Sequence, residues 1–318
     1  MFRTIKCKDK YIKKCDVENL PISYEDKMSV NLFGNQIKVE KNAWMWHLHL
    51  KITNRCNAKC SFCVEQNSHC NENSKYYIGQ VDKMLSEMEK ARILFSVSIT
   101  GGEPFLFPEF RALCEVLRRH NIKFLTMNTN ASYLEENVAV VDGLFDFIDI
   151  SRHSISDKEN FDVFNCQYVP TISDLKRIKS KMIHTKMRIQ CVMEKLNTTE
   201  KMKQFIDAFS FADDISFRRL MKLGDEYGVN YGNVQDNYDQ VLDYAYHNFE
   251  FKEQTIQDYY VYEIWNSNGT DITFSYSNMK MLKEVEQKED SSVTREFIIH
   301  PNGVVSGSWD YNRKVILS

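Results

Sequence analysis

The stretch Lys51-Ile-Thr-Asn-Arg-Cys56-Asn-Ala-Lys-Cys60-Ser-Phe-Cys63 decides how the rest of this chain is interpreted. Its three cysteines are separated by three residues and then by two, and they follow an apolar run that is typical of a β-strand. In a cubane iron–sulfur cluster each of the four irons normally takes a protein ligand, so three cysteines leave one iron open. The gaps also differ from those of the ferredoxins, whose motifs supply four cysteines. We therefore interpret Cys56, Cys60 and Cys63 as ligands of one iron–sulfur cluster.

The three cysteines taken alone are also compatible with two simpler assignments. Free cysteine is a common small core residue, so the three thiols could be unrelated. They could also be three ligands of a zinc site that a distant histidine completes. A second segment of the chain favours the cluster.

That second segment is Ser96-Val-Ser-Ile-Thr-Gly101-Gly102-Glu103-Pro104, an alternating strand that ends in two glycines, a carboxylate and a proline. Glycine lets the backbone pass close to a ligand, and the Glu103 carboxylate can accept hydrogen bonds from an ammonium group. Alone, the last four residues would mark only a turn. Their position, one strand and one helix after the cysteine loop, favours a shared binding site.

Taken together, the two motifs resemble those of the radical S-adenosylmethionine (SAM) superfamily, in which an aromatic residue, here Phe62, precedes the last cysteine. The resemblance covers roughly residues 46–222. It implies a 4Fe-4S cluster on Cys56, Cys60 and Cys63, with the open iron chelated by the amino and carboxylate groups of the methionine moiety of SAM. The segment Gly101-Gly102-Glu103-Pro104 corresponds to the family segment that holds the methionine amino group.

The resemblance implies further cofactor contacts along the chain. Asn128 and Asn130 end the third predicted strand, where Thr129-Asn130-Ala131 matches the Thr-Asn-Gly of relatives. Because alanine replaces glycine, the sequence leaves open whether residue 131 adopts a positive backbone angle. Ser151 and Arg152 end the fourth strand, where family members often hold the ribose of the cofactor. Arg188 on the fifth strand is another cofactor-binding candidate.

Strand and helix patterns alternate from about residue 46, which favours parallel strands joined by helical crossovers. Apolar and polar residues also alternate within the strands, as in Leu48 and Leu50 against His49 and Lys51. One face of the sheet should therefore be covered by helices, and the other should be polar and curve around a solvated interior. A one-sided sheet that faces plain water is the alternative. We predict an α/β fold with a partial (β/α)6 TIM-like barrel, which the family resemblance also implies.

The predicted strands run over His47–Thr53, Ser96–Thr100, Lys123–Asn130, Asp146–His153, Lys186–Met193 and Ile215–Met221. The predicted helices run over Val81–Arg92, Pro108–His120, Tyr133–Asp142, a broken stretch Lys158–Met182, and Thr198–Phe211.

Two extensions flank the predicted barrel, which spans residues 46–222. Residues 1–45 contain alternating runs around Gly34-Asn35, a hairpin signature. Residues 223–318 contain two more hairpin signatures, at Asn268-Gly269 and Asn302-Gly303, with a helix over Asn278–Lys288 between them. The chain has no cysteine after Cys191, which argues for a single cluster. We expect the C-terminal extension to close the open side of the barrel, with its aromatic residues as core or as cavity lining.

Several other residues are candidates for chemistry. His153 or Arg152 could bind an anionic group of the substrate or of SAM, joined by Arg188 and by Arg218 or Arg219, or the cluster of polar residues could simply cap a loop. His153, Cys70 and Cys166 are weak catalytic candidates, the two cysteines as hydrogen-atom donors. Cys114 and Cys191 lie on apolar faces and should be core, whereas Cys7 and Cys15 precede the barrel and have no expected role.

Composition agrees with a soluble enzyme. The 318 residues carry 41 basic and 44 acidic side chains, a net charge of −3, so an extended nucleic-acid surface is not indicated. No apolar run approaches the roughly 20 residues of a transmembrane helix, and the N-terminus lacks the apolar core of a signal peptide. We expect a cytoplasmic protein. Its nine cysteines, an odd number, are better explained as thiols and metal ligands than as disulfides.

The resemblance implies that a one-electron donor such as flavodoxin or ferredoxin reduces the cluster, and that SAM is cleaved to methionine and a 5′-deoxyadenosyl radical. This radical would remove a hydrogen atom from the substrate. The polar interior and its arginines favour a small nucleotide- or sugar-like molecule. One alternative is a maturase of a ribosomally made peptide, for which 45 N-terminal residues are few. Another is a non-enzymatic electron-transfer protein, against which the open iron and Glu103 argue.

Overall fold

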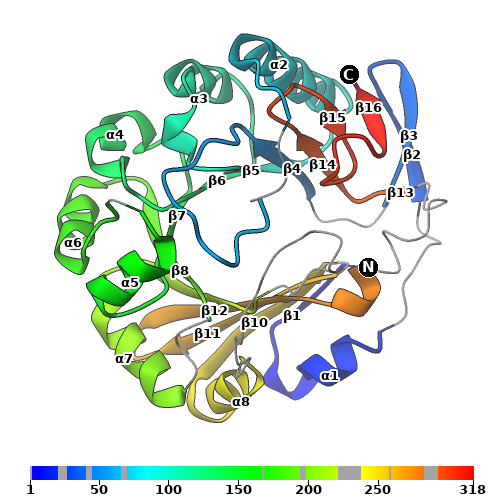
Figure 1. The fold of residues 1–318 in the computed structure, drawn as a ribbon. Coiled ribbons are helices and arrows are strands. Elements are labelled where there is room, and N and C mark those ends of the chain that lie inside the picture. The colour runs from blue at the N-terminus through cyan, green and yellow to red at the C-terminus, as the bar shows by residue number, and fades with distance from the viewer. Residues whose placement is uncertain are drawn as a thin grey trace.

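Six parallel strands form the centre of the computed structural model, which describes residues 2–20, 27–40, 45–65, 70–166, 168–193, 198–220, 238–257, 259–282 and 293–318 (Figure 1). All six were predicted from the sequence. They are β4 (Trp46–Lys51), β5 (Phe95–Thr100), β6 (Phe124–Thr129), β7 (Phe147–Ser151), β8 (Lys186–Val192) and β9 (Asp214–Arg218). They pair side by side in chain order. The predicted end of the last strand, residue 221, lies outside the described residues.

Helices join these strands and cover the outer face of the sheet, as Figure 1 shows. They are α2 (Ser74–Lys90), α3 (Phe110–Arg118), α4 (Leu134–Val141), α5 (Asp157–Phe164), α6 (Ile172–Lys181) and α7 (Thr199–Phe209). The stretch predicted as broken is the pair α5 and α6. Helix α2 begins at Ser74 instead of Val81 because the Asn73 side chain caps it, accepting a 3.2 Å hydrogen bond from the Tyr76 backbone.

The alternation of apolar and polar residues divides the sheet as expected. Leu48 and Leu50 are fully buried in the core beneath the helices. On the opposite face Arg188 lies between two carboxylates of neighbouring strands, donating to Asp149 at 3.2 Å and to Asp214 at 2.9 Å. Arginine held by two acids is typical of a polar interior, because an unpaired guanidinium would be costly to bury.

Strands from the C-terminal part of the chain extend both edges of the parallel sheet. Strand β12 (Thr270–Ser277) pairs in parallel with β9, and β14 (Glu296–Ile299) pairs in parallel with β4. The first arm continues through β11 (Tyr260–Ser267), β10 (Glu250–Gln257) and β1 (Phe2–Ile5), and the second through β15 (Val305–Ser306) and β16 (Val315–Leu317). Among the described residues no backbone pairing joins β1 to β16, so the thirteen-stranded sheet is open. The fold is α/β around a curved, open sheet.

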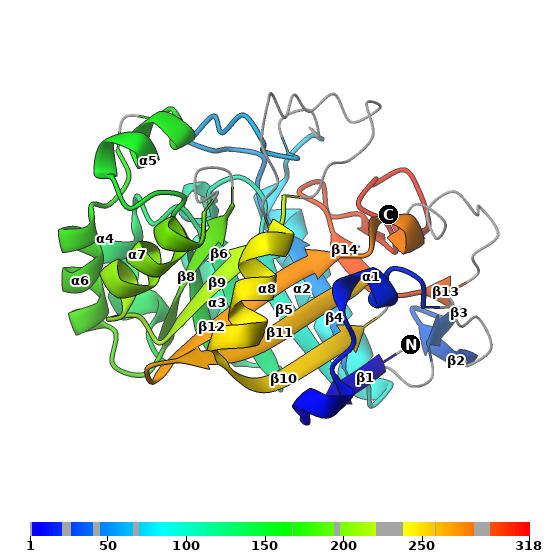
Figure 2. The same cartoon turned by 90° about the horizontal axis from the view of Figure 1, so that it is seen from below.

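Smaller elements complete the architecture. The hairpin β2 (Lys27–Leu32) and β3 (Asn35–Glu40) forms a second sheet with β13 (Val293–Thr294). Further helices are η1 (Lys8–Lys10), α1 (Lys14–Val17), η2 (Pro104–Leu106) and α8 (Tyr238–Asn248). Figure 2 shows α8 lying across the outside of β10–β12. Within the described residues no helix is long and apolar enough to cross a membrane.

The predicted hairpins are confirmed, with one shift. The N-terminal turn uses Phe33 and Gly34, with φ of 55° and 80°, instead of Gly34 and Asn35. A tight two-residue turn needs two left-handed residues, and Phe33 adopts this conformation although glycine suits it better. Asn268 and Gly269 form the second turn as predicted. Of the helix predicted over Asn278–Lys288, residues 279–282 are helical and the remainder lies outside the described residues.

The two arms of the sheet meet through side chains instead of backbone pairing. Glu296 of β14 is buried, and it accepts hydrogen bonds from Tyr259 beside β11 at 2.6 Å and from Trp309 at 3.0 Å. His49 of β4 lies 3.0 Å from the same carboxylate, and the Tyr260 hydroxyl lies 3.5 Å from it. We call these five residues the Glu296 cluster. The C-terminal extension thus flanks both edges of the parallel sheet and links them through this cluster.

Candidate functional site

The predicted site residues gather at one edge of the parallel sheet. The cysteine loop follows β4, the Gly-Gly-Glu-Pro segment follows β5, Asn130 follows β6, and His153 lies just beyond β7. Strands that run in parallel all end at the same edge, where loops from different strands can build one site. Figure 2 shows the connections that follow β4 and β7 on the same side of the sheet.

The two motifs are fastened to each other along the backbone. The Gly102 amide donates to the Thr53 carbonyl at 2.8 Å, and the Glu103 amide donates to the Arg55 carbonyl at 2.7 Å. A Cβ atom on Gly102 would lie 2.0 Å from the Arg55 oxygen, and one on Gly101 would lie 2.5 Å from the Thr53 oxygen. The sequence suggested that these glycines make room for a ligand. In the structure they make room for the start of the cysteine loop.

Glu103 lies beneath this junction and is almost fully buried. Its carboxylate accepts a hydrogen bond from the Thr129 hydroxyl at 2.7 Å and one from the Asn130 amide at 2.9 Å. Burial raises the pKa of Glu103 to about 7, although both of these hydrogen bonds oppose the shift. Glu103 therefore links the segments that follow β5 and β6.

The cysteine loop has further anchors that sequence reasoning missed. The Asn57 side chain donates to the Ser132 hydroxyl at 2.9 Å and accepts from the Asn130 amide group at 2.8 Å. The Lys59 backbone amide donates to the Phe164 carbonyl at the end of α5, at 2.8 Å. Asparagine beside a cysteine occurs in many loops, so the local sequence carried no sign of these contacts.

Residue 131 answers the question that the sequence left open. Ala131 has a φ of 63° and is fully buried, and its amide donates to the Thr129 hydroxyl at 2.9 Å. The left-handed conformation is thus retained without glycine. Its cost, roughly 1 kcal/mol for a residue with a Cβ atom, is offset by the surrounding hydrogen bonds.

The three cysteines of the loop have the chemistry that a metal cluster requires. None is in a disulfide; Cys56 is exposed, while Cys60 and Cys63 are partly buried. Burial raises the pKa of Cys56 to about 11 and that of Cys60 to about 12, and the neighbouring thiols add to the shift at Cys60. Thiolates at these positions need a nearby positive charge, which bound iron supplies.

The three thiols of the loop are close enough for their charges to act on one another. Within the described residues no three His, Cys, Asp or Glu side chains converge closely enough to hold one metal ion. In a cubane each thiolate binds a different iron, so the ligands need not meet at one point. Cys166, beyond α5, is a fourth thiol whose charge acts on Cys56 and Cys60.

Arg152 and His153 are buried and have local partners. The Arg152 guanidinium donates to the carbonyls of Ser154 and Pro170, at 2.7 and 3.1 Å, and to the Asp157 carboxylate at 2.7 Å. His153 accepts a 3.2 Å hydrogen bond from the Val192 amide. Burial lowers the pKa of His153 to about 3, so the ring is neutral at pH 7. This pattern resembles the loop cap that the sequence offered as the alternative to anion binding.

The His153 ring also connects β7 to the cysteine loop. It contacts Phe62, the aromatic residue before Cys63, edge to face with the ring centroids 5.1 Å apart. On its other side it packs against Phe164 at the same centroid distance. Phe62 therefore has an observed structural partner in addition to its expected role beside the cofactor.

The remaining predicted residues are spread along the edge and the interior. The Asn128 side chain donates weakly to the Ser98 hydroxyl at 3.4 Å, and Ser151 pairs in register with Gln190. Pro104 begins η2. Cys70 precedes α2, and its carbonyl accepts from the Asn54 side chain at 2.8 Å. Cys114 and Cys191 are buried in the core, as predicted.

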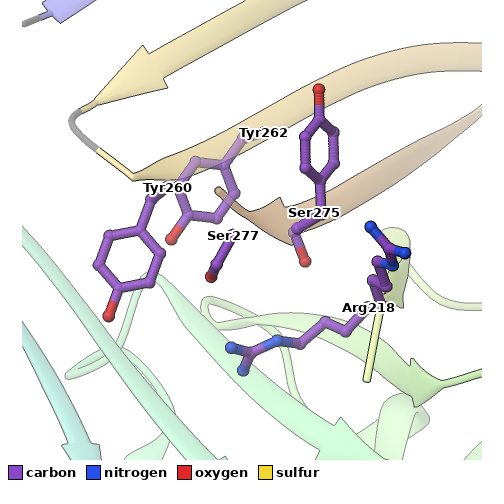
Figure 3. A pocket seen from close by; sticks show the side chains of 7 residues that line it. Arg218, Tyr260, Tyr262, Ser275 and Ser277 are labelled. Carbon is purple, nitrogen blue, oxygen red and sulfur yellow. The ribbon is translucent and has the colours of Figure 1, made fainter. Parts of the chain in front are cut away.

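A pocket in the polar interior involves residues that sequence reasoning only partly identified. Figure 3 shows Arg218, Tyr260, Tyr262, Ser275 and Ser277 around it, from β9, β11 and β12. Arg218 was a candidate anion ligand. The tyrosines and serines could have been suspected from their alternate positions in two adjacent strands, but pairing of β12 with β9 brings together segments that are far apart in the sequence.

Comparisons with known proteins agree on one family. GTP 3′,8-cyclase of Staphylococcus haemolyticus is 24% identical over 211 residues, a match that covers 63% of this chain and 61% of the relative. A probable GTP 3′,8-cyclase of Methanocaldococcus jannaschii is 27% identical over 103 residues, 32% of each chain. The matched regions thus span about a third to three fifths of these curated relatives.

Solved structures show the same fold at low sequence identity. Streptococcus suis SuiB bound to S-adenosylmethionine superposes with a TM-score of 0.58 at 19% identity, covering 83% of this chain and 60% of SuiB. The protein anSMEcpe with bound AdoMet superposes with a TM-score of 0.52 at 19% identity, covering 86% of this chain and 77% of that one. The family model of the Radical SAM superfamily matches residues 50–211, just over half of the chain and the whole region of the two motifs. This chain therefore belongs to the radical SAM superfamily.

Proposed function

We propose that this chain is a radical enzyme that acts on a small nucleotide- or sugar-like molecule. Its superfamily uses a 4Fe-4S cluster and SAM. Together, when bound, they supply a 5′-deoxyadenosyl radical that removes a hydrogen atom from a substrate. The observation that carries the proposal is the backbone junction between the cysteine loop and Gly101-Gly102-Glu103, which fixes the two motifs against each other at the edge of the sheet.

The proposed roles follow the positions of the residues. Cys56, Cys60 and Cys63 hold the cluster, and Gly101 to Pro104 bind the methionine end of SAM. Asn128, Asn130 and Ser151 contribute to the rest of the cofactor site. Because Arg152 and Arg188 already have acceptors within the protein, we assign them to positioning the loop beyond β7 and the polar interior. His153 packs Phe62 and takes no proton at neutral pH.

Three broader expectations remain proposals. The open curved sheet acts as a partial (β/α)6 barrel whose polar interior holds the substrate. The chain divides into three regions, residues 1–45, 46–222 and 223–318. The middle region carries both motifs, and the outer two carry the hairpins. A one-electron donor such as flavodoxin or ferredoxin reduces the cluster, and the protein is cytoplasmic.

The relatives support two substrate classes. Two of the curated relatives are named for a reaction of GTP, which supports a nucleotide-like substrate. SuiB has also been solved bound to its precursor peptide SuiA, with a TM-score of 0.58 to this chain, and this makes a peptide the second candidate. The polar interior, with Arg188 between the buried acids Asp149 and Asp214, supports a small polar molecule, because a few placed charged and polar groups are what orient such a ligand.

The proposal can be tested with anaerobically reconstituted, dithionite-reduced protein and SAM. We expect 5′-deoxyadenosine to form, and its yield to rise when nucleotides or sugar nucleotides are added but not when peptides are added. A failure to form 5′-deoxyadenosine with any of these would contradict radical chemistry. A rise with peptides alone would replace the small-molecule proposal with the maturase.

Ligation is tested separately with Cys60→Ala, using Cys15→Ala as the control because Cys15 is an exposed cysteine on α1. We expect Cys60→Ala to lose the brown cluster absorbance and most of its iron, and Cys15→Ala to keep both. Full iron content in Cys60→Ala would reject the assigned ligands.

A further inference from the structure

The pocket between β9, β11 and β12 contains several hydrogen-bond donors. It encloses about 240 Å³, including open solvent at its mouth. Figure 3 shows the Arg218 side chain reaching beneath Tyr262 and Ser277, with the Tyr260 ring beyond them. Ser275 and Ser277 are buried, while Tyr262 is 39% exposed. The pocket is therefore lined by buried serines on one side and by the more exposed Tyr262 on the other.

Three of these groups lack a side-chain partner among the described residues. In that part of the chain the Arg218 guanidinium, the Tyr262 hydroxyl and the Ser275 hydroxyl make no side-chain hydrogen bond or ion pair. None of the three is a fully buried polar atom without a partner, so water can reach them, and a ligand could take the place of that water. A ligand with several acceptor atoms would satisfy all three together.

The neighbouring arginines differ in this respect. Arg188 is held between Asp149 and Asp214, and Arg219 reaches Glu18 at 3.7 Å. Arg188 thus has two carboxylates for its one guanidinium. The charge of Arg218 acts on Asp149, but Arg218 forms no ion pair with Asp149 or Asp214 among the described residues. The Arg218 guanidinium is therefore the cationic group in the pocket that is available to an anion.

We propose that this pocket binds an oxyanion group of the substrate, either a phosphate or a carboxylate. A planar guanidinium matches two oxygens of such a group, and hydroxyls of tyrosine and serine donate to the others. The Tyr260 hydroxyl lies 3.5 Å from Glu296 as part of the Glu296 cluster, so it is not counted among the donors to the ligand. Cationic and purely apolar ligands would leave the three donors unmet. The inference deepens the proposed function and rests on it, since it names the part of the substrate that the C-terminal strands hold.

The test uses the full-length, cluster-reconstituted protein and two simple probes, inorganic phosphate and acetate. Binding is followed by phosphorus-31 line broadening for phosphate and carbon-13 line broadening for acetate. We expect at least one probe to bind the wild type, and Arg218→Gln to weaken this binding by about tenfold or more. Tyr262→Phe removes one hydroxyl and should weaken it by several-fold. The control is Arg177→Gln, because Arg177 is an exposed residue of α6 that pairs with Glu135 and Asp174; this variant should bind the probes as the wild type does.

The outcomes separate the two oxyanions and the two proposals. Binding of phosphate that depends on Arg218 assigns a phosphate group, and binding of acetate alone that depends on Arg218 assigns a carboxylate. Binding of neither probe, or equal binding by wild type and Arg218→Gln, overturns the inference. Because neither probe needs SAM cleavage, Cys60→Ala should still bind them. A protein that makes no 5′-deoxyadenosine but shows Arg218-dependent binding would overturn the radical function and leave the oxyanion site standing.

Discussion

At the scale of single residues, Gly102 shows how backbone packing determines residue identity near the cysteine loop. Its amide donates to Thr53, and its missing Cβ atom leaves the space that the Arg55 carbonyl occupies. A side chain here would separate the two loops that the proposed cofactor site requires. The packing of the two loops therefore requires glycine at residue 102 even without a ligand.

Replacing Gly102 by alanine should damage both folding and cluster binding. The new Cβ atom would lie 2.0 Å from backbone, which cannot move as a flexible side chain can. We expect the free energy of unfolding to fall by about 2 kcal/mol or more and the iron content after reconstitution to fall with it. Thermal unfolding and iron analysis measure the two effects.

Gly79→Ala is the matched control for this change. Gly79 lies in α2, where a Cβ atom would have no neighbouring atom within 4 Å, and alanine favours a helix by roughly 0.5–1 kcal/mol over glycine. The control should be as stable as the wild type or slightly more stable. Equal stability of the Gly102 and Gly79 variants would show that the close approach is unimportant.

Arg152 provides a second residue-scale prediction, because anion binding and loop positioning differ in their consequences. Lysine keeps the charge but cannot reach the carbonyls of Ser154 and Pro170 and the Asp157 carboxylate together. We expect Arg152→Lys to lower the free energy of unfolding by about 2–4 kcal/mol while the concentration of SAM needed for half-maximal activity changes little. Chemical unfolding and initial rates test this. Unchanged stability with much weaker SAM binding would favour the anion role.

At the scale of elements, the segment after η1 is attached to the first arm by a buried carboxylate. Glu263 of β11 accepts hydrogen bonds from Tyr11 at 3.0 Å, Tyr276 at 3.1 Å and Gln254 at 3.2 Å, and it is fully buried. Gln254 in turn binds the backbone of Ile12 through both its amide atoms. A few N-terminal residues are thereby fixed against β10, β11 and β12.

This carboxylate should make stability depend on pH. Burial raises the pKa of Glu263 to about 7, from 4.5 for an unperturbed glutamate, with its hydrogen bonds opposing the shift. Between these values the folded protein holds a proton that the unfolded chain has released, so unfolding becomes easier as pH rises, by up to about 1.4 kcal/mol per pH unit. Glu263→Gln has no such proton. Its stability deficit relative to wild type should therefore shrink between pH 5 and pH 7 in urea unfolding; parallel pH profiles would contradict the raised pKa.

The elements also show which parts of the fold can be predicted from the sequence. The six parallel strands and their helices follow from alternation, and the turn at Asn268-Gly269 follows from its Asn-Gly pair, because these signals are local. The parallel pairing of β12 with β9 and of β14 with β4 could not be predicted, since local alternation does not say which distant strand lies alongside. The sequence left Arg152 open between an anion ligand and a loop cap, because it does not show that the Asp157 carboxylate and the Pro170 carbonyl accept its hydrogen bonds.

At the scale of the whole molecule, the Glu296 cluster holds the two arms of the open sheet together. The buried carboxylate receives donors from both arms, and the hydrogen bond and charge of His49 keep the pKa of Glu296 below its usual value despite burial. A sheet that is closed by backbone pairing has no free edge. In the part of this sheet that the structure describes, side-chain contacts link the arms instead, chiefly at Glu296 and also from Gln257 of β10 to the Met45 carbonyl at 3.3 Å.

Glu296→Ala should weaken the contact between the two arms of the sheet at the Glu296 cluster. Removal of the carboxylate leaves Tyr259, Trp309 and His49 without their acceptor, which should lower the free energy of unfolding by about 3 kcal/mol. Hydrogen exchange should accelerate in β14 and β11 more than in β6 and β7. The control Glu135→Ala removes an exposed acid from α4 and should leave the exchange pattern unchanged. Uniform acceleration of exchange across all strands would contradict a role of Glu296 that is confined to the contact between the two arms.

The pairing of β14 with β4 also sets an order of events during biosynthesis. His49 of β4 and Glu296 of β14 are 247 residues apart, so β4 leaves the ribosome on the order of tens of seconds before its outer neighbour is made. Throughout that interval β4 is an unprotected edge strand, able to pair with another nascent chain, and the cysteine loop emerges directly behind it. Iron delivered during translation would reach the cysteine loop while β4 still lacks its pairing with β14. Efficient maturation of this protein therefore calls for cluster delivery after release from the ribosome, or for a chaperone that covers β4 until β14 arrives.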